Sequence, residues 1–422
     1  MRAYATILRR HRVVRASAAA IFLYGFAGAA TSPYQAVIGI RELGLTDRAY
    51  AMIALAASIA NVVLAIGIGL LSDRFQSYRR PLIFVSAFGI VGYGAIWAVP
   101  SPLTFALAMV GPLALFHATN SMLFGNVRAH TERFDAEEAG VVNALMRMMI
   151  SLSWVLVPGA VGIALAGRES MIASYLIAAA TAGACLLTIM FWLEPDHRPA
   201  AEARPEGGTG TARVAPTTGR PDRPAQVRLA RPAFLDLMQI LSPGILARIL
   251  GVALISQVLH VNAAVLPLIV TGQAGGKPED IGFIVGMVAL LEVLFMIFWA
   301  HVSRGMHLTR ALLITSALYF LYLAAVAAAT QPWHAYAASV IAGFAAAGII
   351  SLPIGYLLDL IRDRPGLSAS LIAVNMFFGG ALGAGIFALG TAMGGYPAAA
   401  LLAGAGGVLG ALMLVGLERR GA

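Results

Sequence analysis

Charged residues are scarce in this sequence. They make up 12% of its 422 residues, whereas hydrophobic residues make up 59%. In a soluble domain about a quarter of the residues would be charged. The composition therefore excludes a soluble protein, and the mean hydropathy of +0.81 indicates a chain that crosses a membrane several times.

Cysteine and lysine are almost absent. The one cysteine, Cys185, cannot form an internal disulfide and has no partners nearby for a metal site, so we interpret it as a small core residue. The one lysine is Lys277, and the remaining basic residues are arginines spread over many short loops. Because they form no patch, nucleic-acid binding is excluded.

Motifs of catalysis are also missing. The run Gly272–Lys277 lacks the spacing and the following Ser or Thr of a phosphate-binding loop. The sequence contains no G-x-S-x-G motif and no His/Cys cluster with metal-ligand spacing. We therefore expect no enzyme, no catalytic residues, no metal and no cofactor.

What the sequence does contain is a series of long apolar stretches. A membrane-spanning helix needs roughly 20 mostly apolar residues, and twelve stretches meet this requirement. They lie near residues 15–39, 48–71, 81–99, 103–124, 139–165, 170–193, 245–269, 281–300, 311–328, 335–358, 367–391 and 395–417. The expected fold is an all-α integral membrane protein with twelve transmembrane helices.

The largest change in composition falls at residues 194–235. This segment is rich in proline and arginine and has few large apolar residues, which predicts a flexible linker. The expected organisation is a tail at 1–14, a six-helix bundle at 15–193, the linker at 194–235, a second six-helix bundle at 236–417, and a tail at 418–422.

The arginines indicate how the chain is oriented. If both termini are cytoplasmic, nearly all of them lie on the cytoplasmic side, together with the linker. The other side then carries Arg41, Arg48, Arg168 and Lys277, and Arg147 and Arg248 fall within spans. Basic residues accumulate in cytoplasmic loops, so we expect both termini and the linker to be cytoplasmic.

Polar residues are unevenly distributed among the spans. The third, sixth, ninth and twelfth spans contain no Asn, Gln, His, Asp, Glu, Lys or Arg. Because polar groups are expensive in lipid, the spans that do carry them are expected to line an aqueous path. The buried amides and ionisable groups on these other spans are Gln35, Asn61, His117, Asn120, Asn143, Arg147, Arg248, Gln257, His260, Asn262, Glu292 and Asn375.

The loop after the second span carries a family signature. Gly69, Asp73, Arg74, Arg79 and Arg80 follow one another in a pattern similar to G-x-x-x-D-R-x-G-R-R, with the central glycine missing and the loop longer by about two residues. With six spans, a linker and six more spans, the chain resembles the major facilitator superfamily. That resemblance implies two six-helix bundles around a central cavity and an inner gate at these five residues. An ordinary arginine-rich loop is the alternative.

The fifth span resembles one branch of that superfamily, the bacterial sugar efflux transporters, which are proton-linked. The run from Met146 to Pro158 carries most of this resemblance, and shorter matches lie in spans 4, 8, 10 and 11. The matching residues are Leu123, Phe124, Arg128, Met146, Arg147, Ser151, Leu152, Trp154, Val155, Pro158, Leu291, Glu292, Asp359, Leu360, Gly366 and Asn375. The long linker is a departure from that branch.

Two ionisable residues are expected near the middle of the membrane. Glu292 lies about twelve residues into its span, where a lone carboxyl group favours its neutral form. It is our candidate for binding and releasing the coupling proton; the alternative is a permanently neutral acid that bonds to a neighbouring helix. Arg147 is its expected electrostatic partner. Alternatively, Arg147 locks backbone carbonyls or the cytoplasmic gate.

Substrate contacts are expected where amides and a flat aromatic face meet the cavity, because hydroxyl-rich ligands require both. Asn143, Arg147, Ser151, Trp154 and Pro158 share one helical stripe. Gln257 and His260 share a face, while Asn262 points about 200° away from His260. The candidates are Tyr34, Gln35, Asn120, Arg147, Trp154, Gln257, His260 and Asn375. Each amide could equally hold two helices together.

The expected function is export of small sugars or glycosides by alternating access, with protons as the coupling ion. The alternatives are a proton-linked exporter of drugs or metabolites, an uptake symporter, and a non-transporting membrane sensor. We expect a monomer, in contact with the lipid bilayer, in a bacterial inner membrane.

Overall fold

The computed structural model describes residues 7–8, 10–75, 79–131, 134–168, 170–193, 242–360 and 365–421, and within these ranges it is all helical apart from short turns. The expected linker at 194–235 lies outside the described residues. The helices are α2 (Arg12–Thr31), η1 (Ser32–Tyr34), α3 (Gln35–Val37), η2 (Ile38–Glu42), α4 (Asp47–Phe75), α5 (Arg79–Ala98), α6 (Pro102–Val110), α7 (Pro112–Thr131), α8 (Ala136–Ala164), α9 (Ala173–Phe191), α11 (Pro243–Val270), α12 (Pro278–Val302), α13 (Leu308–Ala327), α14 (Pro332–Leu360) and α15 (Pro365–Gly421).

The all-α fold with twelve membrane crossings is confirmed. Among the described residues, eleven helical spans are long and apolar enough to cross a membrane. The last of them, within α15, has 46 residues, about twice the number that one crossing needs. Its helix bends at Gly394 and Gly395, and Gly395 has a φ of 73°, which a residue with a side chain rarely adopts. The two arms of α15 therefore form the eleventh and twelfth crossings.

Two crossings that the sequence suggests as continuous helices are interrupted. In the first, α2 passes into the 3₁₀ turn η1, which contains Pro33, and the crossing ends in the π-helical turn η2. In the fourth, Gly111 separates α6 from α7, because Pro112 has no N–H with which to continue the ladder. Proline explains both interruptions, and the second leaves α7 running on to Thr131.

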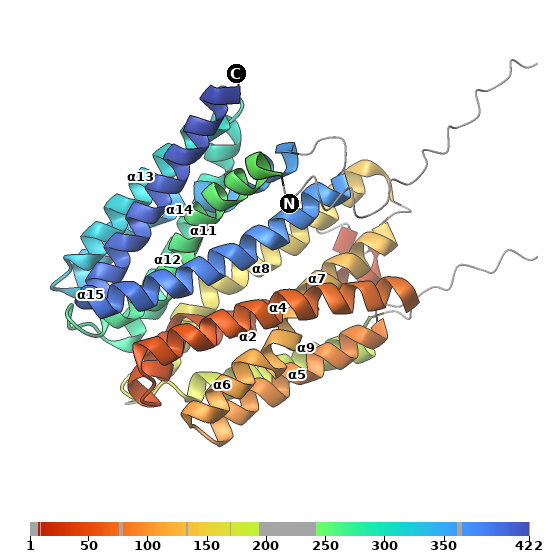
Figure 1. Cartoon of the computed structure of the whole chain (residues 1–422). Helices are drawn as coiled ribbons and strands as arrows, with labels where there is room; N and C mark the ends of the chain where they lie inside the picture. The colour runs from red at the N-terminus through yellow and green to blue at the C-terminus, as the bar shows by residue number, and fades with distance from the viewer. Residues whose placement is uncertain are drawn as a thin grey trace, which may run out of the picture.

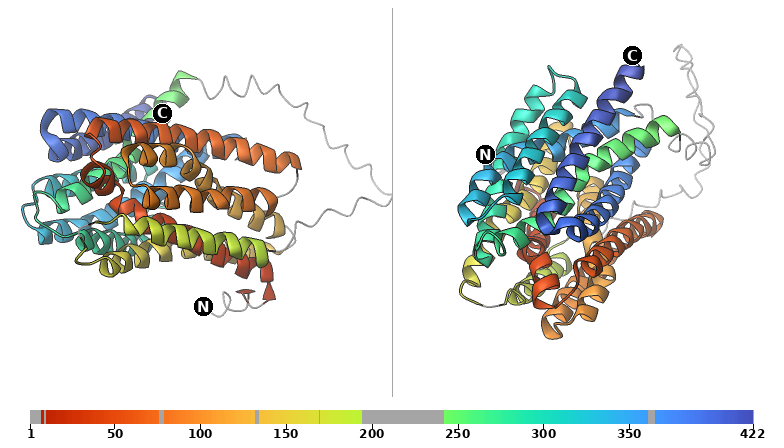
Figure 2. Two further views of the ribbon diagram at one scale, coloured as in Figure 1. Left: turned by 90° about the horizontal axis from the view of Figure 1, so that it is seen from below. Right: turned by 60° about the vertical axis from the view of Figure 1, so that its left-hand side comes forward.

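The helices gather into two bundles, which Figures 1 and 2 show as red to yellow-green and green to blue. We call residues 12–191 the first bundle and residues 243–421 the second. The end where residues 191 and 243 lie is the linker end, and the opposite end, where Glu42 and Val270 lie, is the far end.

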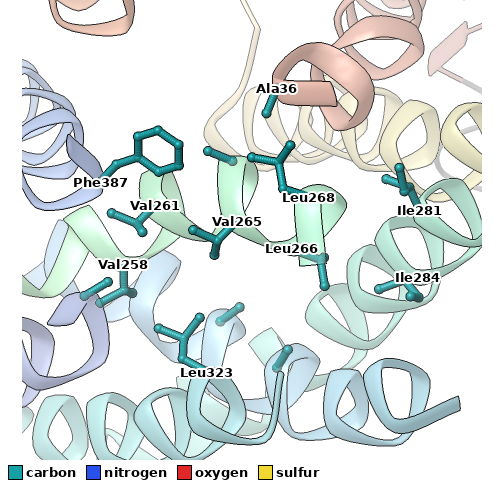
Figure 3. Close-up of a cluster of buried hydrophobic side chains, with 14 of the residues drawn as sticks. Ala36, Val258, Val261, Val265, Leu266, Leu268, Ile281, Ile284, Leu323 and Phe387 are labelled. Atoms are coloured by element: carbon teal, nitrogen blue, oxygen red, sulfur yellow. The ribbon is translucent and has the colours of Figure 1, made fainter. Parts of the chain in front are cut away.

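Helix α11 is the centre of the second bundle and also contacts the first. Val258, Val265 and Leu268 are buried on it. Figure 3 shows α11 passing between Ala36 of the first bundle and Leu323 of α13. Most of its residues from Ile249 to Val270 are buried within the protein. Among its polar side chains Gln257 is buried as well, whereas Asn262 is half-buried and His260 is exposed.

Contacts between the bundles concentrate toward the far end. The α8 and α12 helices touch at glycines: Gly282 lies against the Pro158 carbonyl and Gly286 against the Val155 carbonyl. On the other flank, the Tyr396 hydroxyl donates to Asp47 Oδ1 at 3.1 Å. These contacts all lie in the halves of the helices farther from the linker end. Figure 1 shows the bundles diverging toward the linker end.

Candidate functional site

A cavity of about 420 Å³ lies between the two bundles. Residues of α8 and η1 form one wall, and residues of α11, α12, α13 and α14 form the other. The lining is Ser32, Pro33, Ile150, Ser151, Trp154, Leu259, Asn262, Ala263, Leu266, Pro267, Val285, Val288, Ala289, Glu292, Val293, Met296, Tyr319 and Ile350. Most of these side chains are apolar, and a few polar groups converge among them, as is typical of small-molecule sites.

Trp154 and Ser151 reach the cavity from α8. They are three residues apart and therefore share a helix face, which agrees with the stripe expected from the sequence. Both are half-buried. The Trp154 indole N–H has no hydrogen-bond partner within the described part of the chain, so it is available to a ligand. The ring offers a flat apolar face at one side of the cavity.

Glu292 reaches the same cavity from α12. Its neighbours along the helix, Val288, Ala289 and Val293, line the wall with it. No hydrogen bond or ion pair to its carboxyl group occurs among the described residues. A carboxyl group among apolar side chains and without a cation is much more easily accommodated when it is protonated.

Arg147 does not line this cavity. It is exposed on α8, one helical turn from Ser151 toward the linker end. In the described part of the structure no ion pair joins it to Glu292. Arg147 therefore lies closer to the linker end than the cavity lining of α8 does.

A smaller cavity of about 100 Å³ adjoins the first, with Ser32 and Ala263 common to both linings. Gln35 and His260 line it, together with Ser58 and Tyr50. The Gln35 amide donates to Met109 Sδ at 3.4 Å. These two candidates thus lie beside the main cavity rather than in it.

Three other candidates hold helices together. The buried Gln257 donates its amide to the Ala403 carbonyl at 2.7 Å and to the Leu254 carbonyl at 3.2 Å. Asn375 donates to Ser256 Oγ at 3.1 Å. The buried Tyr34 donates to the Pro158 carbonyl at 2.8 Å, at the contact between α8 and α12. None of the three lines either cavity.

Asn120 and the expected inner gate complete the candidates. Asn120 is half-buried on α7, outside both linings, with Oδ1 unpaired. Arg79 donates to the Met190 carbonyl and so ties α5 to α9, while Arg80 is exposed. The side chains of Gly69, Asp73 and Arg74 lie outside the described residues.

Two residues that were not among the predicted substrate contacts also line the main cavity. Asn262 lines the main cavity, although helical spacing set it apart from Gln257 and His260. Tyr319 lines it from α13, the ninth span, which carries none of the amides and ionisable groups used to predict the aqueous path. Tyrosine is neither an amide nor charged at neutral pH, so the pattern of amides and charged groups did not point to α13. The spacing of its tyrosines at 319 and 322, three residues apart on one face, is the signal that could have found them.

Comparison with known proteins agrees with this architecture. Solved structures with the same fold include the nucleoside transporter NupG, with a TM-score of 0.74 and 13% identity over 97% of this chain and 99% of that one. A POT family transporter in complex with a thioalcohol-conjugated peptide has a TM-score of 0.75 and 11% identity over 97% and 96% of the two chains. At such identities the likeness shows the fold alone.

Sequence comparison is more specific. A Deinococcus radiodurans protein named "Putative sugar efflux transporter" is 27% identical over 340 residues, which cover 77% of this chain and 79% of that protein. Residues 17–261, more than half of the chain, match the model of the Major Facilitator Superfamily. The chain is therefore a multi-pass membrane transporter rather than an enzyme, and it belongs to the major facilitator superfamily.

Proposed function

We propose that this protein exports small sugars or glycosides from the cytoplasm in exchange for protons. The observation that carries the proposal is the central cavity, in which Glu292 and Trp154 face each other's bundle among apolar walls. The name of the Deinococcus radiodurans relative supports sugars as the substrate class. The bundles of residues 15–193 and 236–417 rock around this cavity, and a monomer is sufficient for transport.

The protonation state of Glu292 links substrate to proton. An ionised carboxylate accepts strong hydrogen bonds from sugar hydroxyls, and a protonated one accepts weaker bonds. Substrate and proton therefore compete for the same group. Substrate entering from the linker end binds the ionised form, and protonation from the more acidic far side releases it there. The protonated carboxyl then returns empty, because the neutral form is better tolerated among apolar walls.

Orientation in the membrane follows from the arginine distribution. In this proposal the linker end, both termini and the segment 194–235 are cytoplasmic, and the membrane is a bacterial inner membrane. Gly69, Asp73, Arg74, Arg79 and Arg80 form the inner gate. Arg147 stands between that gate and the cavity, where it attracts the hydroxyl groups of the substrate or pairs with Glu292 when the linker end closes.

Proton-linked export of amphipathic drugs or metabolites is the second candidate. The observation in its favour is the apolar character of the cavity wall, where Leu266, Val285, Val293 and Met296 line it. Apolar surface of this kind accepts many shapes. In that case removal of any single polar group would change transport little.

The test uses everted membrane vesicles with an acidic interior. Uptake of radiolabelled phenyl β-glucoside, methyl β-glucoside and lactose is followed beside uptake of ethidium. The variants are Glu292→Gln and, as a matched control, Glu137→Gln, which changes an exposed carboxylate at the first turn of α8. The expected result is gradient-driven glycoside uptake by the wild type and by the control, and loss of gradient dependence in Glu292→Gln.

Other results would change the proposal. If the vesicles take up ethidium and none of the glycosides, drug export replaces sugar export as the proposed function. Glycoside uptake that stays coupled to the gradient in Glu292→Gln would keep the transport function and remove Glu292 from the coupling step.

A further inference from the structure

Asn262 and Tyr322 form a polar pair beside the central cavity. Tyr322 on α13 is fully buried, and its hydroxyl donates to Asn262 Oδ1 at 2.9 Å. Asn262 itself is only half-buried and lines the cavity. The pair therefore joins a fixed, enclosed hydroxyl to an amide at the cavity surface.

The hydrogen bond fixes which end of the amide is free. A carboxamide has one oxygen that accepts and one nitrogen that donates twice. The bond turns the oxygen toward Tyr322 and therefore turns the nitrogen, with its two N–H groups, away from Tyr322. No hydrogen bond from Asn262 Nδ2 occurs among the described residues. Buried donors are normally paired, and a donor at a cavity surface is paired by water or by a ligand.

Gln257 provides a contrast on the same helix. Its amide nitrogen is consumed by the carbonyl oxygens of Leu254 and Ala403, and the residue is fully buried. The bond to Ala403 joins α11 to the second arm of α15. Asn262 makes its one bond through oxygen to its own bundle and keeps its donor free.

The cavity also presents an acceptor on the same bundle, the Glu292 carboxylate of α12. A donor and an acceptor on one wall suit a group that can both accept and donate. A hydroxyl does both, whereas an ammonium or other cation only donates. A hydroxylated ligand can satisfy both residues, and a cationic ligand leaves Asn262 unpaired.

We infer that Asn262 is a substrate-contact residue that donates to a substrate hydroxyl, and that Tyr322 is the positioning residue that holds its donor toward the cavity. The inference rests on the proposed function and narrows it to ligands that carry hydroxyl groups. It places recognition of those groups on α11 and α12.

The test measures discrimination in everted vesicles. Wild type, Asn262→Ala, Tyr322→Phe and the double variant are compared for inhibition of phenyl β-glucoside uptake by its monodeoxy analogues. In the wild type, loss of one particular hydroxyl weakens inhibition about tenfold, as expected when a site donor is left unpaired. Asn262→Ala abolishes that difference between analogues. Tyr322→Phe reduces it severalfold, because the amide is then free to turn.

The double variant separates positioning from folding. Because Asn262→Ala already abolishes discrimination, this comparison uses the KM for phenyl β-glucoside. If Tyr322 acts through Asn262, Tyr322→Phe raises KM in the wild-type background and not in the Asn262→Ala background, whereas a merely structural role raises KM by the same factor in both. Size-exclusion profiles confirm that each variant is folded.

Each failure points to a different cause. If Asn262→Ala discriminates between the analogues as well as the wild type does, this inference is wrong, and the proposal of sugar export is unaffected. An equal increase in KM from Tyr322→Phe in both backgrounds would remove its positioning role. A wild type that carries ethidium and no glycoside, or that carries no glycoside at all, would overturn both the inference and the proposed function.

Discussion

The guanidinium group of Arg41 donates to the carbonyl oxygen of Leu268 at 2.6 Å. It also donates to Thr271 Oγ1 at 2.6 Å. Arg41 lies in η2 at the end of the first crossing, and Leu268 lies near the end of α11, so this pair joins the two bundles across the far end. It adds to the contacts that close the two bundles against each other at the far end.

We predict that Arg41→Ala loosens this closure. The bond has a charged donor but is exposed, so its contribution is about 1 kcal/mol, equivalent to a severalfold change in the population of states open at the far end. The measurement is the reaction rate of Ala263→Cys, at the cavity surface, with an impermeant maleimide added from the far side. Faster labelling is expected in Arg41→Ala.

Arg48→Ala is the matched control for that experiment. Arg48 is an exposed arginine on the same side, and within the described part of the chain it makes no hydrogen bond. Labelling as slow as that of the unaltered protein is expected. Equal acceleration by both substitutions would mean that charge alone, and no specific latch, governs access.

Gly282 sets how closely α12 approaches α8. A Cβ at this position would meet the Pro158 carbonyl oxygen and the Tyr34 hydroxyl far inside van der Waals contact. Gly282→Ala therefore pushes the bundles apart at the far end and reduces transport at least severalfold. The comparison is Gly159→Ala on the facing helix, where the nearest atom to a new Cβ is 3.6 Å away. Transport that falls equally in both variants would contradict this reason.

Trp154 provides the aromatic face of the cavity. Trp154→Ala is expected to raise the KM for phenyl β-glucoside about tenfold, since stacking and burial on an aromatic ring contribute about 1–2 kcal/mol. Trp154→Phe is expected to lie in between. Leu152→Ala, two residues away and outside the cavity lining, should leave KM unchanged. An unchanged KM in Trp154→Ala would show that the substrate does not contact this face of α8.

Gln257 is expected to affect stability rather than recognition. Gln257→Leu removes hydrogen bonds to two carbonyl oxygens, which keep their own helical bonds, at a cost of about 1 kcal/mol. The apparent melting temperature in detergent should fall by several degrees, while discrimination between phenyl β-glucoside and its deoxy analogues stays as in the wild type. A changed discrimination with an unchanged melting temperature would return Gln257 to the substrate site.

Much of the fold could be predicted because the bilayer imposes it. Apolar length alone identifies the twelve crossings, even where α15 runs through two of them as one bent helix. The interruptions at η1 and Gly111 were harder to predict, because proline is tolerated in membrane helices and its effect depends on what packs beside it.

The site was predicted only in part. Helical spacing identifies which residues share a face of a helix, but it does not identify the helix or cavity that this face contacts. Ser151, Trp154 and Glu292 share a cavity, as their positions suggested. Gln257 and Asn262 are both amides on α11, and the sequence could not tell which one finds a carbonyl oxygen. That depends on how closely the second arm of α15 approaches, which the small residues around Ala403 and Gly406 determine.

Three of the contacts at the far end terminate on main-chain oxygens: Arg41 contacts the Leu268 carbonyl, and Tyr34 and Gly282 contact the Pro158 carbonyl. A main-chain carbonyl oxygen is present whatever the side chain and does not titrate. The acceptors of these contacts are therefore affected neither by side-chain substitution nor by acid. Substitutions that loosen these contacts should collect at the donors and glycines in a genetic screen, and not at Leu268. In the proposed mechanism, acid on the far side therefore acts on Glu292 in the cavity and on the Asp47 carboxylate that accepts from Tyr396, and leaves these main-chain contacts unchanged.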